Sequence, residues 1–361
     1  MLEPLTISCH GADMLDSMKT NSVEGAAEPV ASVPGVSVIL PILNEEKDLE
    51  LAVNRILAQE YSGPFEVVLA VGPSNDRTME IAEELSERDS RITVVENPTG
   101  ATPAGLNIAI KAARHDILVR VDGHSIIPDG YVAEAVSVML ETRAANVGGM
   151  MMPQGTNPFS EAVARAMSSP LGIGSAPFHT GGHAGPADTV YLGVFQRKAL
   201  ERIGGFDERF ARAQDWELNY RLRKAGEKVW FDPSLQVGYH PRRNLKALAK
   251  QFFRTGRWRR HVIRAYPETA GLRYLAPPAA VIGLTIGTAA GIVGAFSTGV
   301  FQWLNFGWLA PFGYTVLVVG GSAASSRGLS NAAKLRLPLV IATMHTSWGI
   351  GFLLPARNDR P

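Results

Sequence analysis

Between residues 36 and 121 the chain alternates short apolar runs with longer stretches of helical spacing. The apolar runs cover residues 36–40, 65–71, 92–95 and 117–121, and their length and composition are typical of buried strands. The three intervening stretches place apolar side chains three and four positions apart, which predicts amphipathic helices over residues 46–59, 76–87 and 102–113. Strands and helices that alternate in this way predict an α/β fold: a parallel sheet with helices on both faces.

Four loops follow the carboxyl ends of the predicted strands, where ligands bind in open sheets of this kind. They cover residues 41–45, 72–78, 97–107 and 122–125. The fourth loop is the most informative, because it holds Asp122 and His124 on either side of Gly123. Two such side chains can reach one cation if the chain bends between them, and glycine permits that bend. We therefore expect a divalent cation and a diphosphate here, although a histidine that only forms a loop hydrogen bond is an open alternative for His124.

The C-terminal third has a different pattern. From Tyr274 to Ser326 the chain contains no Asp, Glu, Lys, Arg or His. One membrane span needs about 20 apolar residues, so this stretch predicts two transmembrane helices, over about residues 275–300 and 303–322. A third apolar piece, residues 337–355, is only just long enough to span. The alternative is a buried hairpin in the core of a soluble protein.

The distribution of charged residues predicts how the transmembrane hairpin is oriented in the membrane. The net charge is +1, so we expect no nucleic-acid partner. Lys and Arg are frequent in residues 242–273 and again in residues 327–336, which flank the predicted hairpin on the same side. The positive-inside rule places that side in the cytoplasm. We therefore predict a multi-pass protein of the cytoplasmic membrane with a cytoplasmic N-terminal domain.

Residues 242–264 contain no acid, and aromatic side chains lie between the basic ones. Such a segment predicts a helix that lies on an anionic membrane surface with its rings inward, so membrane lipids are expected partners. Residues 1–34 have no periodicity and predict a disordered tail; we see no signal peptide. The single cysteine excludes an intramolecular disulfide. The predicted organisation comprises a tail at 1–34, an α/β domain at 35–240, a basic interfacial segment at 241–273, a transmembrane region at 274–355 with two to three helices, and a tail at 356–361.

Several motifs occur together in a fixed order along the chain. They are Pro-Ile-Leu-Asn-Glu at 41–45, Ser-Asn-Asp-Arg-Thr at 74–78, Asp-Gly-His at 122–124, Gly-Gly-Phe-Asp-Glu at 204–208 and Gln-Asp-Trp-Glu-Leu-Asn-Tyr-Arg-Leu at 214–222. Over residues 36–265 the chain resembles the family 2 glycosyltransferases. The motif at 214–222 and Gln-Phe-Phe-Arg-Thr-Gly-Arg-Trp at 251–258 are most similar to the membrane-anchored transferases of bacterial exopolysaccharide synthesis, of the succinoglycan type.

This resemblance implies a GT-A fold, a nucleotide-diphospho-sugar donor, a divalent metal and inversion at the anomeric carbon. Asp215 matches the family's catalytic aspartate and is expected to act as the general base. Asp122 is expected to bind both metal and donor. His124 stands where the family usually has an acid, and histidine favours Mn²⁺ over Mg²⁺. His240 is a candidate for a further metal ligand, so the expected cofactor is Mn²⁺ or Mg²⁺.

Other residues are assigned to the donor or the acceptor. Donor contacts are expected from Pro41, Asn44, Glu45, Asp76, Asn107 and Asp122. Contacts with the acceptor or with a diphosphate are expected from Glu217, Arg254, Arg257 and Trp258. Simpler structural roles stay open for several of them: a first-turn acid for Asp215 and Glu45, a helix cap for Asp76, and a structural histidine for His240.

Together these features predict an inverting, metal-dependent glycosyltransferase at the cytoplasmic membrane face, with a lipid-linked or growing glycan as acceptor. One alternative is a transferase that uses a polyprenyl phosphate acceptor. Another is a non-catalytic relative that scaffolds a membrane assembly, because Val71-Gly72 and Gln214 stand where the family often has acids.

Overall fold

The computed structural model describes residues 33–123 and 125–354. Residues 1–32 of the predicted N-terminal tail, His124 and residues 355–361 therefore lie outside the described residues. The first half of the sheet confirms the predicted parallel arrangement, with strand order β3-β2-β1-β4. Its elements are β1 (Val36–Ile42), α1 (Leu49–Leu57), β2 (Phe65–Val71), α2 (Thr78–Arg88), β3 (Ile92–Glu96), α3 (Thr102–Ala112) and β4 (Ile117–Arg120).

The second half of the sheet is mixed, and the prediction of parallel strands, which was drawn from residues 36–121, does not extend to it. The order continues from β4 as β7-β5-β8-β6, and β7 runs antiparallel to both β4 and β5. An antiparallel neighbour needs no crossover helix, so strand–helix alternation in the sequence does not reveal it. The strands are β5 (Asn146–Pro153), β6 (Gly185–Pro186), β7 (Tyr191–Gln196) and β8 (Val229–Tyr239).

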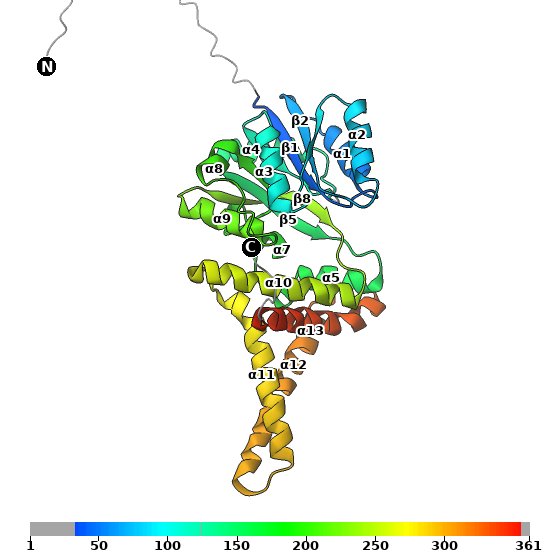
Figure 1. The fold of residues 1–361 in the computed structure, drawn as a ribbon. Coiled ribbons are helices and arrows are strands. Elements are labelled where there is room, and N and C mark those ends of the chain that lie inside the picture. Colours follow the sequence, from blue (N-terminus) through cyan, green and yellow to red (C-terminus); the bar gives the residue numbers. More distant parts are fainter. Residues whose placement is uncertain (1–32, 124, 355–361) are drawn as a thin grey trace, which may run out of the picture. The chain divides into compact units, whose positions relative to one another are not determined.

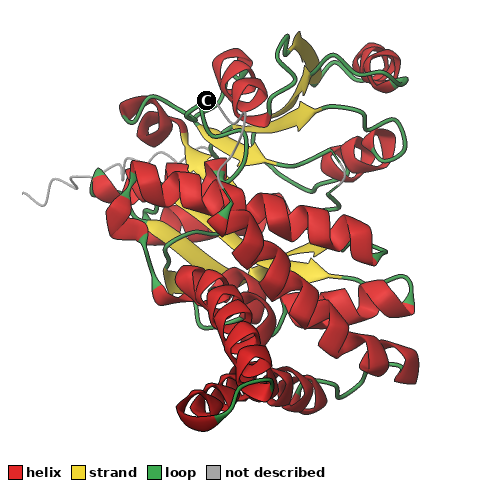
Figure 2. Ribbon diagram, turned by 60° about the horizontal axis from the view of Figure 1, so that its bottom comes forward, coloured by secondary structure: helices red, strands yellow, loops and turns green. Residues whose placement is uncertain are grey.

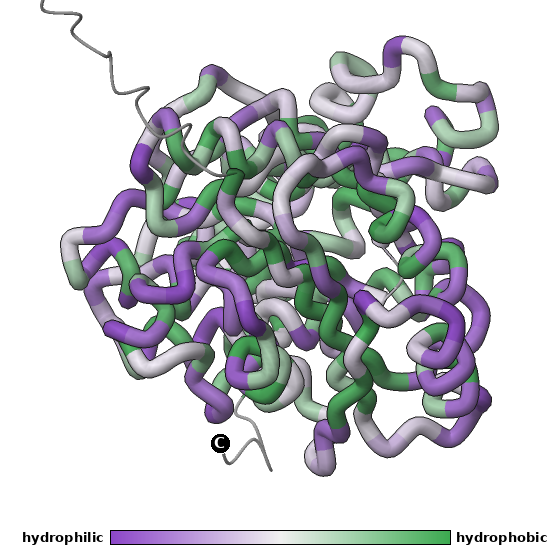
Figure 3. The backbone as a smooth tube through the Cα atoms, turned by 90° about the horizontal axis from the view of Figure 1, so that it is seen from above, coloured by the Kyte–Doolittle hydropathy of each residue, from purple (hydrophilic) through white to green (hydrophobic). Residues whose placement is uncertain are grey.

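Helices cover both faces of the sheet, because successive strand residues point to opposite faces. On β1, Val38 and Leu40 pack with α1, α2 and α4 (Tyr131–Thr142), whereas Ile39 packs with α3, α8 (Arg197–Arg202) and α9 (Gln214–Lys224). Figure 2 shows helices in front of and behind the strands, and Figure 3 shows apolar segments gathered in the interior. The loops at the carboxyl ends of β1, β2 and β4 are thereby fixed on a rigid base.

A third apolar cluster joins helices that follow the sheet. It combines α5 (Pro158–Met167), α10 (Leu245–Ala265) and α13 (Asn331–Leu353), with α6 (Pro170–Ile173) and α7 (Pro177–Thr180) connecting it to the sheet. In Figure 1, α13 lies beside α10 and α5. Phe252 on α10 is buried against Trp348 on α13. The predicted basic helix exists, but α13 covers part of the apolar face that we expected to rest on lipid.

The predicted transmembrane hairpin is formed by α11 (Leu272–Ala295), η2 (Gly299–Trp308) and α12 (Leu309–Ala324); η1 (Pro267–Thr269) precedes it. Among the described helices, Leu272–Ala295 and Gly299–Ala324 are long and apolar enough to cross a membrane. Only 22% and 11% of their most apolar stretches are buried, which contradicts the alternative of a soluble core hairpin. By contrast, α13 packs against α5 and α10, so its apolar residues are used within the protein.

Candidate active site

The centre of the site is Arg120, the last residue of β4, which is only 4% exposed. Its guanidinium donates to two carboxylates from distant parts of the sequence. The Nε and Nη2 atoms lie 3.1 and 3.0 Å from Oδ1 of Asp122, and Nη1 forms an ion pair with Asp215. Asp122 and Asp215, which were predicted separately, therefore both contact the buried guanidinium of Arg120.

The charges in this cluster shift one another. Burial alone would lower the pKa of the Arg120 guanidinium, but the charges of Asp122 and Asp215 outweigh it, so the pKa is raised. Burial among protein groups raises the pKa of Asp215; Arg120 opposes this effect and the charge of Asp122 adds to it. The Asp215 side chain still keeps 40% of its surface exposed. Asp215 is thus a solvent-reachable carboxylate with an increased proton affinity, which suits a general base.

The turn before α9 positions Asp215. Ala213 adopts a left-handed conformation with φ of 61°, and α9 begins at the next residue. Asp215 lies in the first turn, where the helix dipole favours a negative charge. The structural reading of Asp215 as a first-turn acid therefore applies, and it is compatible with the contact to Arg120.

The loops after β1 and β2 are joined by hydrogen bonds. The backbone N–H of Asn44 donates to Ser74 (3.0 Å), and the Asn44 side chain accepts from the N–H of Asn75 (2.8 Å). Asp76 accepts from the N–H of Thr78 (3.1 Å), the first residue of α2, although the N-cap position of this helix is held by Arg77 and not by Asp76. These contacts give Asn44 and Asp76 a structural function, and their contact with a donor stays a prediction.

Two further donor candidates lie at the same edge. Pro41 is in β1, two residues beyond the last β1–β4 pair, Ile39 with Arg120. The side chain of Glu45 lies against Gly123, where an added Cβ would come within 3.0 Å of the Glu45 Cγ. Glu45 is therefore beside the loop that contains Asp122, as the sequence predicted. The predicted metal ligand His124 lies outside the described residues.

The side chain of Asn107, which was expected to contact the donor, forms hydrogen bonds within the protein. Its amide accepts from the N–H of Phe206 (2.9 Å) and donates to the carbonyl of Phe206 (2.9 Å) and to Glu208 (3.0 Å). Gly205 has a positive φ of 72°, and a Cβ there would lie 2.8 Å from the Asn107 oxygen. The side chain thus ties α3 to the loop of residues 204–208, and contact with the donor is not needed to explain it.

His240 follows the last residue of β8 and is exposed. A bridge between Ile126 and Gly238 places this strand end next to the loop that follows Asp122. Among residues 33–123 and 125–354, however, no group of three or more His, Cys, Asp or Glu side chains is placed to hold a metal. Metal binding by His240 remains a prediction.

The position of Glu217 does not fit the expected contact with the acceptor or with a diphosphate. Its side chain is fully buried and lies 2.6 and 2.7 Å from two nitrogens of Arg221, and it accepts from the Tyr266 hydroxyl at 2.9 Å. A carboxylate neutralised in this way cannot receive an acceptor sugar from solvent. Glu217 instead joins α9 to the segment after α10, because its position on α9 points inward.

The basic helix α10 places a positive charge near Arg212, which precedes α9. Arg254 is exposed, and together with Arg242 it lowers the pKa of Arg212, for which burial is the larger cause. Arg212 lies three residues before Asp215. Trp258 packs edge-on against His261 (5.5 Å between ring centroids), and the Arg257 guanidinium lies 5.8 Å from the Phe253 ring.

Sequence reasoning missed Arg120 and Arg212. Arg120 carried a signal: it is a single charge inside an otherwise apolar strand, and such a charge is seldom buried without a partner. Arg212 carried no comparable signal, because its neighbours on α10 are distant in sequence.

Comparison with known proteins agrees with the class that this fold and site define. The profile of "Glycosyl transferase family 2" matches residues 37–204. The "Succinoglycan biosynthesis protein ExoA" of Rhizobium meliloti (strain 1021) is 30% identical over 318 residues, which are 87% of this chain and 93% of that protein. The chain therefore belongs to glycosyltransferase family 2, and it is a glycosyltransferase.

Two further proteins are similar to the chain. A Methanococcus voltae protein, "Dolichyl N-acetyl-alpha-D-glucosaminyl phosphate 3-beta-D-2,3-diacetamido-2,3-dideoxy-beta-D-glucuronosyltransferase", is 26% identical and covers 60% of this chain and 70% of itself. The solved structure of mannosyltransferase PcManGT from Pyrobaculum calidifontis, in complex with GDP-Man and Mn²⁺, has a TM-score of 0.54 at 20% identity. It covers 90% of this chain and 89% of that one, and it shows the GT-A fold.

Proposed function

We propose that this protein is an inverting glycosyltransferase that moves a sugar from a nucleotide-diphospho-sugar to a lipid-linked saccharide at the cytoplasmic face of the membrane. One observation carries the proposal: Asp122, at the carboxyl end of β4, and Asp215, at the start of α9, contact the same buried Arg120. Donor-side and acceptor-side carboxylates are thereby held at one place.

The two carboxylates have different roles in this proposal. Inversion by direct displacement needs one base, on the side of the sugar opposite the leaving diphosphate. Asp215 takes the acceptor hydroxyl proton while the acceptor oxygen bonds to the anomeric carbon and the bond to the diphosphate oxygen breaks. Its raised pKa increases its affinity for that proton, and Arg120 fixes its orientation.

A divalent metal fits the residues present. Both hydrogen bonds from Arg120 are to Oδ1 of Asp122, so Oδ2 would be the oxygen available to hold a cation. Mg²⁺ and similar ions are often held by one or two carboxylates plus substrate phosphates, so a single described carboxylate is compatible with such a site. Asp122 would hold the ion, with His124 and His240 as further candidates. When bound, the metal supplies positive charge that stabilises the leaving diphosphate.

Arg212, which precedes α9, and two arginines of the following basic segment support an acceptor that carries phosphate. Burial lowers the pKa of Arg212, and the positive charges of Arg254 and Arg242 lower it further, so these three cations repel one another. An anionic lipid carrier would relieve their repulsion. The Methanococcus relative is named for a dolichyl-linked sugar phosphate, which favours a lipid-linked saccharide over a bare polyprenyl phosphate.

The test compares Asp215→Asn and Asp122→Asn with the exposed control Glu80→Gln in membranes supplied with UDP-, GDP- and dTDP-sugars. Asp215→Asn should lower transfer by about 10²–10⁴-fold, the range for a lost general base, while the donor still binds. Asp122→Asn should weaken metal-dependent donor binding, and Glu80→Gln should behave as wild type. Undiminished transfer by Asp215→Asn would remove Asp215 from the role of base.

A further inference from the structure

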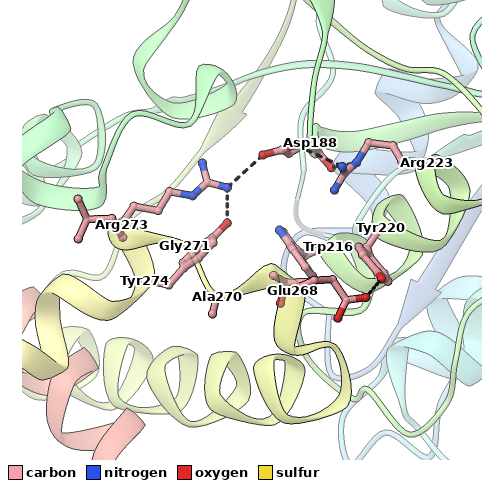
Figure 4. Close-up of a pocket in the computed structure, with 11 residues that line it drawn as sticks. Asp188, Trp216, Tyr220, Arg223, Glu268, Ala270, Gly271, Arg273 and Tyr274 are labelled. Atoms are coloured by element: carbon pink, nitrogen blue, oxygen red, sulfur yellow. Dashed lines mark hydrogen bonds and ion pairs between the residues drawn. The ribbon is translucent and has the colours of Figure 1, made fainter.

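A cavity of about 650 Å³ lies between α9 and the start of α11. A second hollow of about 430 Å³ adjoins it, and the two share Asp188, Arg223 and Arg273. Figure 4 shows the lining side chains facing a common space, with Trp216 and Tyr220 coming from α9 and Arg273 and Tyr274 from α11. Volumes of this size are typical of ligand sites.

The charged groups on the wall balance one another. Asp188 lies 3.4 Å from Arg223 and 3.9 Å from Arg273, while Glu268 accepts from the Tyr220 hydroxyl and lies 3.8 Å from Lys224. The long ion-pair distances leave hydrogen-bonding capacity on both guanidinium groups and both carboxylates. The wall therefore offers many donors and acceptors without a large net charge.

Flat aromatic surfaces complete the wall. The rings of Trp216 and Tyr220 are nearly parallel, 8° apart with centroids at 5.8 Å. The guanidinium of the buried Arg259 lies 4.0 Å from the centre of the Trp216 ring and 3.4 Å from that of the Tyr274 ring, and Arg273 lies 4.5 Å from the Tyr274 ring. This stacking holds two aromatic side chains in place before any ligand arrives.

We propose that this cavity binds sugar residues of the acceptor glycan, behind the sugar that receives the new unit. The inference rests on the proposed transferase function. A pyranose has an apolar C–H face that packs on an aromatic ring, and its hydroxyl groups pair with carboxylates and guanidinium groups. Trp216 directly follows Asp215 on α9, so one helix contributes both the proposed base and the cavity wall.

Two features favour a saccharide over a phosphate group or a lipid surface. Asp188 and Glu268 offset the charges of Arg223 and Arg273, so the cavity wall has no excess of positive charge to attract an anion. The cavity also adjoins Leu272, where the first apolar helix begins. Glycan attached to a membrane lipid would emerge at that level.

The experiment measures binding to the full-length protein in detergent, without donor, by saturation-transfer NMR. The probes are maltotetraose, cellotetraose and chitotetraose, with inorganic pyrophosphate and phosphatidylglycerol vesicles as separate arms. Asp188→Asn and Arg223→Gln alter side chains that are 65% and 34% exposed, so the fold should survive. Each should weaken tetrasaccharide binding at least tenfold, as expected for hydrogen bonds to charged groups.

The matched controls are Glu50→Gln and Arg88→Gln, which break an exposed ion pair of 3.2 Å elsewhere and should leave tetrasaccharide binding unchanged. If wild type binds none of the three tetrasaccharides, or if the cavity variants bind them as wild type does, the inference is overturned. It is also overturned if the cavity variants lose pyrophosphate or vesicle binding instead. Donor turnover is assayed separately, so failure of the transferase proposal would be seen independently of saccharide binding.

Discussion

Arg120 illustrates how one residue can organise a site from within the core. A buried guanidinium is costly unless it is paired, and here Asp122 and Asp215 provide the pairing. The dependence is mutual, because the two carboxylates would repel each other without the cation between them. The geometry of donor and acceptor sides therefore depends on a side chain that touches neither substrate in our proposal.

Two substitutions of Arg120 can distinguish the effect of its positive charge from the effect of its planar guanidinium shape. Arg120→Lys keeps the cation but loses the planar fork that reaches both carboxylates, so transfer should fall at least tenfold. Arg120→Met also leaves Asp122 and Asp215 unpaired and should lower the free energy of unfolding, by less than the ~3–5 kcal/mol of a fully buried pair because both carboxylates are partly exposed. Transfer assays and denaturant titration measure the two effects. Wild-type transfer by Arg120→Lys would show that the shared contact is dispensable.

The pH dependence of transfer follows from Asp215. A base must be deprotonated, and the raised pKa moves the acidic limb of kcat/KM above 3.8, the ordinary aspartate value. The stability effect has the opposite sense. Because the folded state holds this proton more tightly, the contribution of Asp215 to stability is greatest below 3.8 and is lost as pH rises through the raised pKa.

Asp215→Asn should remove that pH-dependent term. As pH rises from 3.8 through the raised pKa of Asp215, the free energy of unfolding of wild type should fall relative to that of Asp215→Asn. Parallel denaturant titrations from pH 3 upward would measure the difference. If the free energies of unfolding of wild type and Asp215→Asn changed with pH in the same way, the raised pKa of Asp215 would be contradicted.

At the scale of elements, the contact between α10 and α13 holds the basic helix in position. Gly256 on α10 faces the backbone of α13, and an added Cβ would lie 2.1 Å from the carbonyl oxygen of Trp348. Gly351 on α13 approaches Phe253 in the same way, with 2.0 Å to its carbonyl oxygen. Two glycines thus permit the two helix backbones to approach closely, as small residues do in tightly packed helix pairs.

Gly256→Ala should push α10 away from α13 and lower the free energy of unfolding by about 1–3 kcal/mol, as overpacking does. Gly283→Ala on α11 is the matched control, because no atom lies within 4 Å of the added Cβ. Thermal unfolding in detergent compares the variants. Equal thermal unfolding midpoints for Gly256→Ala and wild type would show that α10 and α13 accommodate the added methyl group without a loss of stability.

For the whole molecule, we propose two membrane spans, formed by the hairpin, with α13 packed on the protein instead of crossing the membrane. α11 and the segment formed by η2 and α12 expose apolar side chains such as Ile286, Val293 and Phe312, whereas α13 buries Leu337 and Ile341. Two spans bring the chain back to the side from which it started, which fits the basic residues on both flanks of the hairpin. We therefore propose that the site faces the cytoplasm.

Single cysteines can test this topology in a Cys9→Ser background. Thr298→Cys, in the turn between α11 and η2, should react with an impermeant maleimide added to intact cells. Ser326→Cys, after α12, should react only after lysis. The reverse pattern would overturn the proposed orientation.

The sequence by itself determined what depends on short-range patterns. Apolar spacing predicted β1 to β4 and α1 to α3 within a few residues, and the absence of charge predicted the hairpin. Asp122 and Asp215 were found through their motifs. Periodicity reports which face of an element is buried, and this information is local.

Tertiary structure alone decided the antiparallel β7, the burial of Glu217 and the use of Arg120 as a shared partner. Glu217 and Asp215 lie two residues apart on α9, yet one is enclosed with Arg221 and the other reaches solvent. The physical reason is that pairing of strands and of charges joins residues far apart in the chain. Such partners are chosen by the packing of whole elements, which no short stretch of sequence contains.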